Sequence, residues 1–130
     1  MIQVLIIEDE KSNRDLLGVI IGGMEGFAVV ATCATLEEVK SIPDSTLATI
    51  NVATVDGRFP EKKGGVISPE AGRLAAEYLR KINPQVKIIA ISGTEVDPPW
   101  ADTSLGKPFS MDELRAVLAT LASSIQPEPS

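Results

Sequence analysis

The sequence predicts a single α/β domain built on a doubly wound, five-stranded parallel sheet with helices on both faces. Short apolar runs alternate with stretches of helical periodicity along the whole chain, the pattern that βα units produce. The runs contain few polar residues, which is typical of strands covered on both faces. The 130 residues are 44% hydrophobic and suffice for one core, so we expect a domain over residues 1–124 and a disordered tail over residues 125–130.

Five segments are predicted as strands. They are residues 3–7, 27–31, 50–55, 86–91 and 104–105. The first four are rich in Val, Ile and Ala and show no alternation of polar and apolar residues, as expected of buried parallel strands.

Four segments are predicted as helices. They cover about residues 12–21, 35–42, 68–82 and 110–124. Capping boxes at Thr35–Glu38 and Ser110–Glu113 open the second and the fourth. Gly22-Gly23 ends the first helix and Asn83-Pro84 ends the third, because neither pair continues a helix well.

The connection between the last two strands is too short for a helix. Eleven residues, Gly93–Thr103, follow Ser92, and Pro98-Pro99 lies in their middle. A crossover with its helix needs about a dozen residues, and an interior proline costs about 3 kcal/mol. We therefore expect this helix to be vestigial or absent. Trp100 either covers the space that the missing helix leaves or anchors a partner from the surface.

Composition excludes several classes of function. The net charge is −6 and Lys and Arg form no cluster, which argues against direct binding to nucleic acid. The absence of histidine excludes imidazole catalysis and histidine metal ligands. No apolar run approaches the roughly 20 residues of a membrane helix, and Glu8-Asp9-Glu10 interrupts any signal-peptide core. We expect a cytoplasmic protein, with the single Cys33 buried in the core.

Polar residues follow four of the predicted strands. Glu8-Asp9 follows the first, Asp56 the third and Ser92 the fourth, and Lys107 lies just beyond the fifth. Because the carboxyl ends of parallel strands meet at one edge of the sheet, we expect three carboxylates, a hydroxyl and an ammonium group to converge there.

Three neighbouring acids repel one another. Two carboxylates about 4 Å apart cost about 4 kcal/mol at an effective dielectric of 20, so either one acid keeps a raised pKa or a cation binds. Oxygen ligands without His or Cys favour Mg²⁺. Asp56 beside that metal is then a candidate nucleophile toward a phosphoryl donor, and Ser92 and Lys107 are candidates for binding the phosphoryl oxygens.

These motifs resemble those of the receiver domains of two-component response regulators. Val4–Glu10 resembles their first strand and acidic pair, and Asp56 with Pro60 four residues on resembles the phosphoacceptor and its loop. Ile88–Gly93 resembles the fourth strand with its Ser/Thr switch, and Lys107–Phe109 resembles the Lys-Pro-Phe motif. The resemblance covers about residues 1–124. One such motif is weak evidence, but four in order at four strand ends are strong evidence together.

The resemblance implies a flavodoxin-like strand order, 2-1-3-4-5, and a role for each site residue. Asp56 would accept the phosphoryl group, Ser92 would follow it as the conformational switch, and Lys107 would hold it by charge. Pro108 would follow a cis peptide bond.

The resemblance also implies a magnesium site and a set of partners. Asp9 and Asp56 would bind Mg²⁺ with the backbone carbonyl of Arg58, and Glu8 would contribute through water. A histidine kinase or a histidine phosphotransfer protein would donate the phosphoryl group, and an unknown downstream protein would receive the signal by contact. Neither nucleic acid nor membrane is expected as a direct partner.

Two features depart from the family pattern. Glu61–Ser68, between the third strand and the next helix, is longer than a plain βα loop, and is either a mobile solvated loop or a lid or kinase-contacting element. The aromatic switch residue, usually three residues before the lysine, is here Ser104. We therefore expect intact phosphorylation chemistry with an altered output.

Other functions stay open. A receiver-like module that binds a partner without being phosphorylated would account for the missing helix and the missing aromatic residue. A phosphohydrolase with an aspartyl-phosphate intermediate typically carries a second acid where this chain has Arg58, so we do not expect an enzyme in that sense. Flavin binding is disfavoured because no Gly/Ser/Thr-rich phosphate loop follows the first strand.

Overall fold

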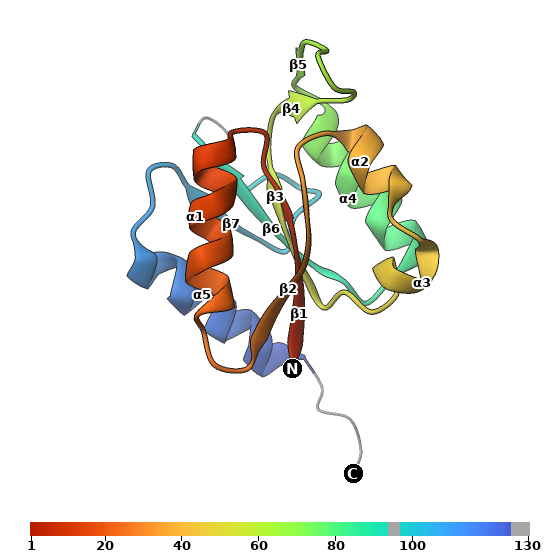
Figure 1. Ribbon diagram of the computed structural model, residues 1–130. Helices are drawn as coiled ribbons and strands as arrows, with labels where there is room; N and C mark the ends of the chain where they lie inside the picture. Colours follow the sequence, from red (N-terminus) through yellow and green to blue (C-terminus); the bar gives the residue numbers. More distant parts are fainter. Residues whose placement is uncertain (94–96, 126–130) are drawn as a thin grey trace.

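The computed structural model describes residues 1–93 and 97–125 and contains the predicted parallel sheet. Its strands follow the order β2-β1-β3-β6-β7 (Figure 1). Their bounds are Ile2–Ile7 for β1, Phe27–Cys33 for β2, Val52–Asp56 for β3, Lys87–Ser92 for β6 and Thr103–Gly106 for β7. Because β6 and β7 are the fourth and fifth strands of this sheet, the predicted order 2-1-3-4-5 is confirmed.

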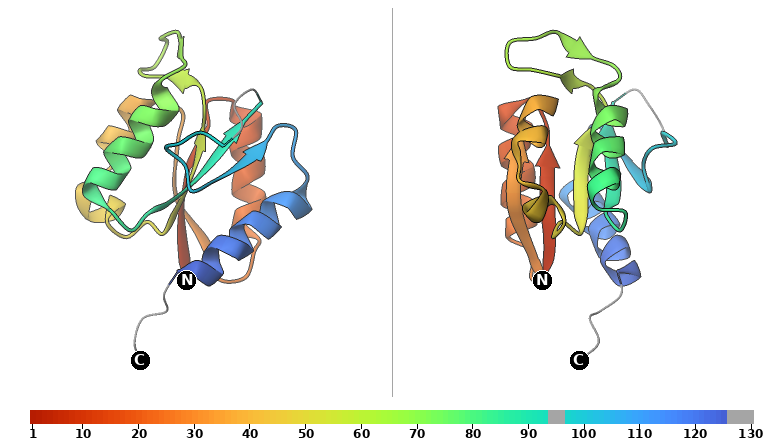
Figure 2. Two further views of the ribbon diagram at one scale, coloured as in Figure 1. Left: turned by 180° about the vertical axis from the view of Figure 1, so that it is seen from behind. Right: turned by 90° about the vertical axis from the view of Figure 1, so that its right-hand side faces the viewer.

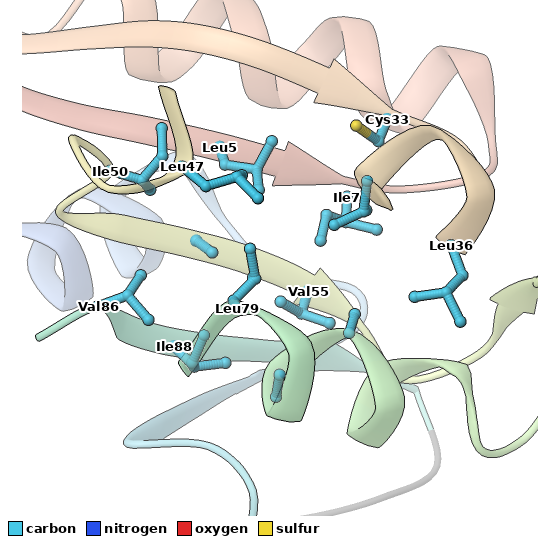
Figure 3. Packing of buried hydrophobic residues seen from close by; sticks show 14 of the residues in the cluster. Leu5, Ile7, Cys33, Leu36, Leu47, Ile50, Val55, Leu79, Val86 and Ile88 are labelled. Carbon is cyan, nitrogen blue, oxygen red and sulfur yellow. The ribbon is translucent and has the colours of Figure 1, made fainter. Parts of the chain in front are cut away.

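Helices cover both faces of the sheet. α1 (Lys11–Gly22) and α5 (Met111–Ser124) pack on one face, whereas α2 (Leu36–Ser41), α3 (Asp44–Leu47) and α4 (Ala71–Ile82) pack on the other (Figure 1). A hydrophobic cluster fills each interface. In the cluster beneath α4, Leu79 lies among Val55 and Ile88 of the sheet (Figure 3).

The central strand β3 is buried along its whole length and ends with Asp56 at the carboxyl edge of the sheet. Its parallel partners keep the strand ends level, with Ile7 of β1 opposite Val55 and Ile91 of β6 opposite Asp56. The residues that follow β1, β3 and β6 therefore emerge side by side. This alignment positions the candidate site.

The predicted helix starts of α2 and α5 are confirmed. The Thr35 side chain accepts a hydrogen bond from the backbone N–H of Glu38, and Ser110 and Glu113 form a complete capping box. α3, which begins just after Pro43, was not predicted because four residues show no periodicity.

The segment Glu61–Ser68, expected as a loop, closes a hairpin. β4 (Phe59–Pro60) pairs antiparallel with β5 (Ile67–Ser68), so α4 begins at Ala71 and not at Ser68 as predicted. Phe59 is fully buried in the cluster beneath α4, and the carbonyl of Glu61 accepts a hydrogen bond from the N–H of Glu37. The hairpin is thus anchored to the domain, and it projects beyond the carboxyl edge of the sheet (Figure 2).

The described residues between β6 and β7 contain no helix, as predicted. Trp100 instead packs, partly buried, against the cluster beneath α4. Its carbonyl accepts a hydrogen bond from Arg80 of α4, which also pairs with the carboxylate of Asp102 at 2.9 Å. Of the two roles considered for Trp100, the structure bears out the covering role.

Ile125 is the last residue that the structure describes. Ile125 packs against the cluster beneath α1 and α5, and the rest of the predicted tail lies outside the described residues. Within the described residues, no helix combines the length and the apolar character needed to cross a membrane.

Candidate functional site

The structure brings Glu8, Asp9, Asp56 and Lys107 together at the carboxyl edge of the sheet. Oxygens of the three carboxylates all lie within 4.8 Å of one another. The Nζ atom of Lys107 lies 2.8 Å from Oε1 of Glu8 and 3.3 Å from Oδ2 of Asp56. Glu8 is 1% exposed and Asp56 is 8% exposed, so these ionisable groups meet largely out of water. The expected convergence is present for the three carboxylates and the ammonium group.

Burial and neighbouring groups shift the pKa values of the clustered acids in different directions. Burial and the neighbouring Glu8 raise the pKa of Asp56 to about 7. Burial also acts to raise the pKa of Glu8, but hydrogen bonds with Asp56 and Lys107 outweigh it and lower that pKa. Glu8 and Lys107 therefore form an ion pair, whereas Asp56 ionises less readily than a free aspartate. Burial and Glu8 raise the pKa of Asp9 as well.

This donor set fits a hard cation. The three side chains offer only oxygen atoms, and when ionised they carry more negative charge than the single ammonium group of Lys107 offsets. A divalent cation would relieve that excess, and oxygen ligands of this kind suit Mg²⁺.

Arg14 holds the backbone of the acidic pair. Its Nη1 atom donates to the carbonyl oxygen of Glu8 at 2.8 Å and to that of Asp9 at 3.2 Å. The N–H of Glu10 donates to Oε2 of Glu8 at 3.2 Å. Sequence reasoning missed Arg14 because its partners are carbonyl groups, which no side-chain pattern marks. The only available signal was a basic residue in the first turns of the helix after the acidic pair.

The turn after β3 lies against the end of β6. A Cβ atom added to Gly57 would lie 3.2 Å from Oγ of Ser92, so the turn and the buried Ser92 are in close contact. The N–H of Arg58 donates to Oδ1 of Asp56 at 3.3 Å, while the Arg58 side chain is exposed. On the other side of the site, the peptide bond between Lys107 and Pro108 is cis.

Comparisons with known proteins find the fold of this chain among solved structures. No protein-family model matches the chain, and no curated protein matches it. Among solved structures, a CheY-like response regulator receiver domain protein from Methanospirillum hungatei JF-1 is 22% identical, with a TM-score of 0.72 and 95% of each chain covered. The non-phosphorylated HemR receiver domain from Leptospira biflexa is 17% identical, with a TM-score of 0.77 over 99% of this chain and 100% of that one.

A third solved structure is a signal receiver domain described as an example of alternate folding. It belongs to a modulated diguanylate cyclase from Desulfovibrio desulfuricans G20 and is 22% identical, with a TM-score of 0.70 and 94% of each chain covered. At these identities the likeness establishes that the chain has the receiver-domain fold over nearly its whole length.

Proposed function

We propose that this protein is a phosphoacceptor receiver domain that takes a phosphoryl group on Asp56 and signals by protein contact. One observation carries the proposal: at the carboxyl edge of a receiver-type sheet, Lys107 bridges Glu8 and Asp56 while Asp9 lies in the same cluster. The site thus combines a buried candidate nucleophile, further acids for a cation and a positive charge for a phosphoryl oxygen.

Transfer to Asp56 requires one bond to form and one to break. An ionised Oδ atom of Asp56 bonds to phosphorus while the bond from phosphorus to the leaving group breaks, and the leaving group departs with the electron pair. With acetyl phosphate as donor, acetate leaves and a mixed anhydride remains on Asp56. The attacking carboxylate must be ionised, so a factor that lowers the raised pKa of Asp56 favours transfer.

The carboxylates of Glu8, Asp9 and Asp56, with the backbone carbonyl of Arg58, would hold Mg²⁺. Bound there, the ion would supply positive charge that offsets the cluster and favours the ionised form of Asp56. Arg14 would keep the backbone of the acidic pair in place through its bonds to the two carbonyl groups.

Lys107 and Ser92 would bind the transferred group. Lys107 already lies 3.3 Å from Oδ2 of Asp56 and would pair with a phosphoryl oxygen. Ser92, packed against Gly57, would donate its hydroxyl to another and would move with it as the switch. The donor would be a histidine kinase or a histidine phosphotransfer protein, and the signal would pass to a downstream protein through contact rather than through turnover of a small substrate.

The proposal is tested by incubating the protein with acetyl phosphate and Mg²⁺ and measuring its intact mass. We expect the wild type to gain one phosphoryl group and Asp56→Asn to gain none. Asp15→Asn, which removes an exposed acid on α1, serves as the control and should be modified like the wild type. If the wild type gains no group while hydrolysis faster than the assay is excluded, the function is instead that of a phosphorylation-independent binding module.

Mg²⁺ should raise the melting temperature of the wild type, and Asp9→Asn should remove most of that rise. Only the folded protein assembles the three carboxylates, so the ion stabilises it by about 1.4 kcal/mol at ten times its dissociation constant. Thermal unfolding at increasing Mg²⁺ concentrations measures the effect, with Asp15→Asn again as the control. A rise of the same size in Asp9→Asn would exclude Asp9 from the metal site.

A further inference from the structure

Gly72, in the first turn of α4, lies where three parts of the molecule meet. A Cβ atom at this position would lie 2.9 Å from the carbonyl oxygen of Asp56 and 3.1 Å from that of Gly57. It would also lie 2.9 Å from Cζ2 of Trp100. The turn that carries the phosphoacceptor candidate, the start of α4 and the indole ring are therefore packed together with no room for a methyl group.

The backbone around Trp100 is held by hydrogen bonds to residues of α4 and β6. Arg80 donates to the carbonyl of Trp100 and pairs with Asp102, whose carboxylate accepts a hydrogen bond from the N–H of Ile88 at 2.7 Å. The N–H of Asp102 in turn donates to the carbonyl of Ile88 at 2.9 Å. The crossover segment, defined here as residues 97–102, is thus fixed to both α4 and β6, and its indole ring lies close to Gly72.

This arrangement places Gly72 between the turn after β3 and the indole ring of Trp100. The carbonyl groups of Asp56 and Gly57 cannot shift toward α4 without displacing either the start of that helix or the indole ring, because close-packed groups transmit displacement. Conversely, removal of the ring would open space beside Gly72, the residue that lies next to the turn after β3. Within the crossover segment, the indole ring of Trp100 supplies one of the three atoms nearest to this position.

We infer that Trp100 is a positioning residue for the turn at Asp56 and Gly57, acting through Gly72, and that it couples the occupancy of Asp56 to the crossover segment. The inference rests on the proposed function of Asp56. It assigns the output of this domain to the surface formed by α4 and the crossover segment, whose described residues form no helix and whose indole ring packs against the core. A coupling of this kind is reciprocal, so it has two measurable sides.

The first measurement uses the fluorescence of Trp100, which is the only tryptophan of the chain. Acetyl phosphate and Mg²⁺ are added, and the emission spectrum and the intact mass are followed on the same sample. We expect the emission to change as the phosphoryl group appears and to return as it is lost. The double variant Trp100→Phe/Phe27→Trp, whose reporter lies at the start of β2 near the opposite edge of the sheet, should show no such change.

The second measurement uses beryllofluoride with Mg²⁺, an analogue of the phosphoryl group that binds at equilibrium. Isothermal titration calorimetry should show that Trp100→Ala changes its affinity about five-fold or more, and that Trp100→Phe, which keeps a ring, restores much of the wild-type value. A role confined to stability would lower the melting temperature of Trp100→Ala without changing this affinity. Should Trp100→Ala fail to fold, the beryllofluoride affinity of Trp100→Phe and the fluorescence of the wild type still test the positioning role of Trp100.

Failure of this inference is distinguishable from failure of the proposed function. A wild type that gains no phosphoryl mass and binds no beryllofluoride contradicts the proposed function. A wild type that gains the phosphoryl group while its emission stays constant overturns the positioning role of Trp100. An unchanged affinity in Trp100→Ala overturns it equally.

Discussion

Asp56→Asn is expected to stabilise the metal-free protein by about 2–4 kcal/mol at pH 8 and to change its stability little at pH 4. Burial and Glu8 raise the pKa of Asp56 from 3.8 to about 7 in the folded protein. Between these two values the folded state binds more protons than the unfolded state, so the stability of the wild type falls as the pH rises. The cost is absent below the lower value and complete above the higher one. A neutral asparagine carries no such cost.

Urea unfolding at pH 4, 5.5, 7 and 8 in the presence of a chelator measures this difference. Asp15→Asn serves as the control, because its hydrogen bond with Lys11 lowers the pKa of Asp15 and its removal should give no gain at pH 8. Added Mg²⁺ should reduce the advantage of Asp56→Asn, because the ion offsets the charge in the wild type. A gain that is the same at all four pH values would show that ionisation of Asp56 is not its cause.

The part of the site that follows from topology could be predicted from the sequence. Glu8, Asp56 and Ser92 each stand at the end of an apolar run, and parallel strands in register carry their ends to the same edge. Lys107 follows the last strand in the same way. That the described residues between β6 and β7 form no helix was also predictable, because the length of a connection and its prolines are local facts.

The contacts made by backbone groups could not be predicted. Arg14 binds two carbonyl groups, and Gly72 matters because it lacks a side chain where Asp56, Gly57 and Trp100 come close. Neither contact follows from periodicity, since each depends on how separate elements pack. The hairpin was missed for a different reason: strands of two residues are too short to show an alternating pattern.

Phe59→Ala is expected to lower the free energy of unfolding by about 3–5 kcal/mol. Phe59 is fully buried in the cluster beneath α4, and its removal would leave a cavity there. It is also the first residue of β4, so its ring fixes the base of the hairpin. Denaturant unfolding measures the loss. Val66→Ala, which truncates a side chain that is 87% exposed on the same hairpin, should change stability by less than about 0.5 kcal/mol.

Limited digestion with trypsin separates local opening of the hairpin from unfolding of the whole domain. Lys62 and Lys63 are exposed in the hairpin, and trypsin cleaves after lysine. In Phe59→Ala, cleavage there should accelerate more than global unfolding does, because local opening of the hairpin no longer requires extraction of a buried ring. If cleavage rose only in step with global unfolding, the hairpin would be held by its pairing and by Glu61 rather than by Phe59. Since Phe59 follows Asp56 by three residues, this anchor also limits how far the turn after β3 can move.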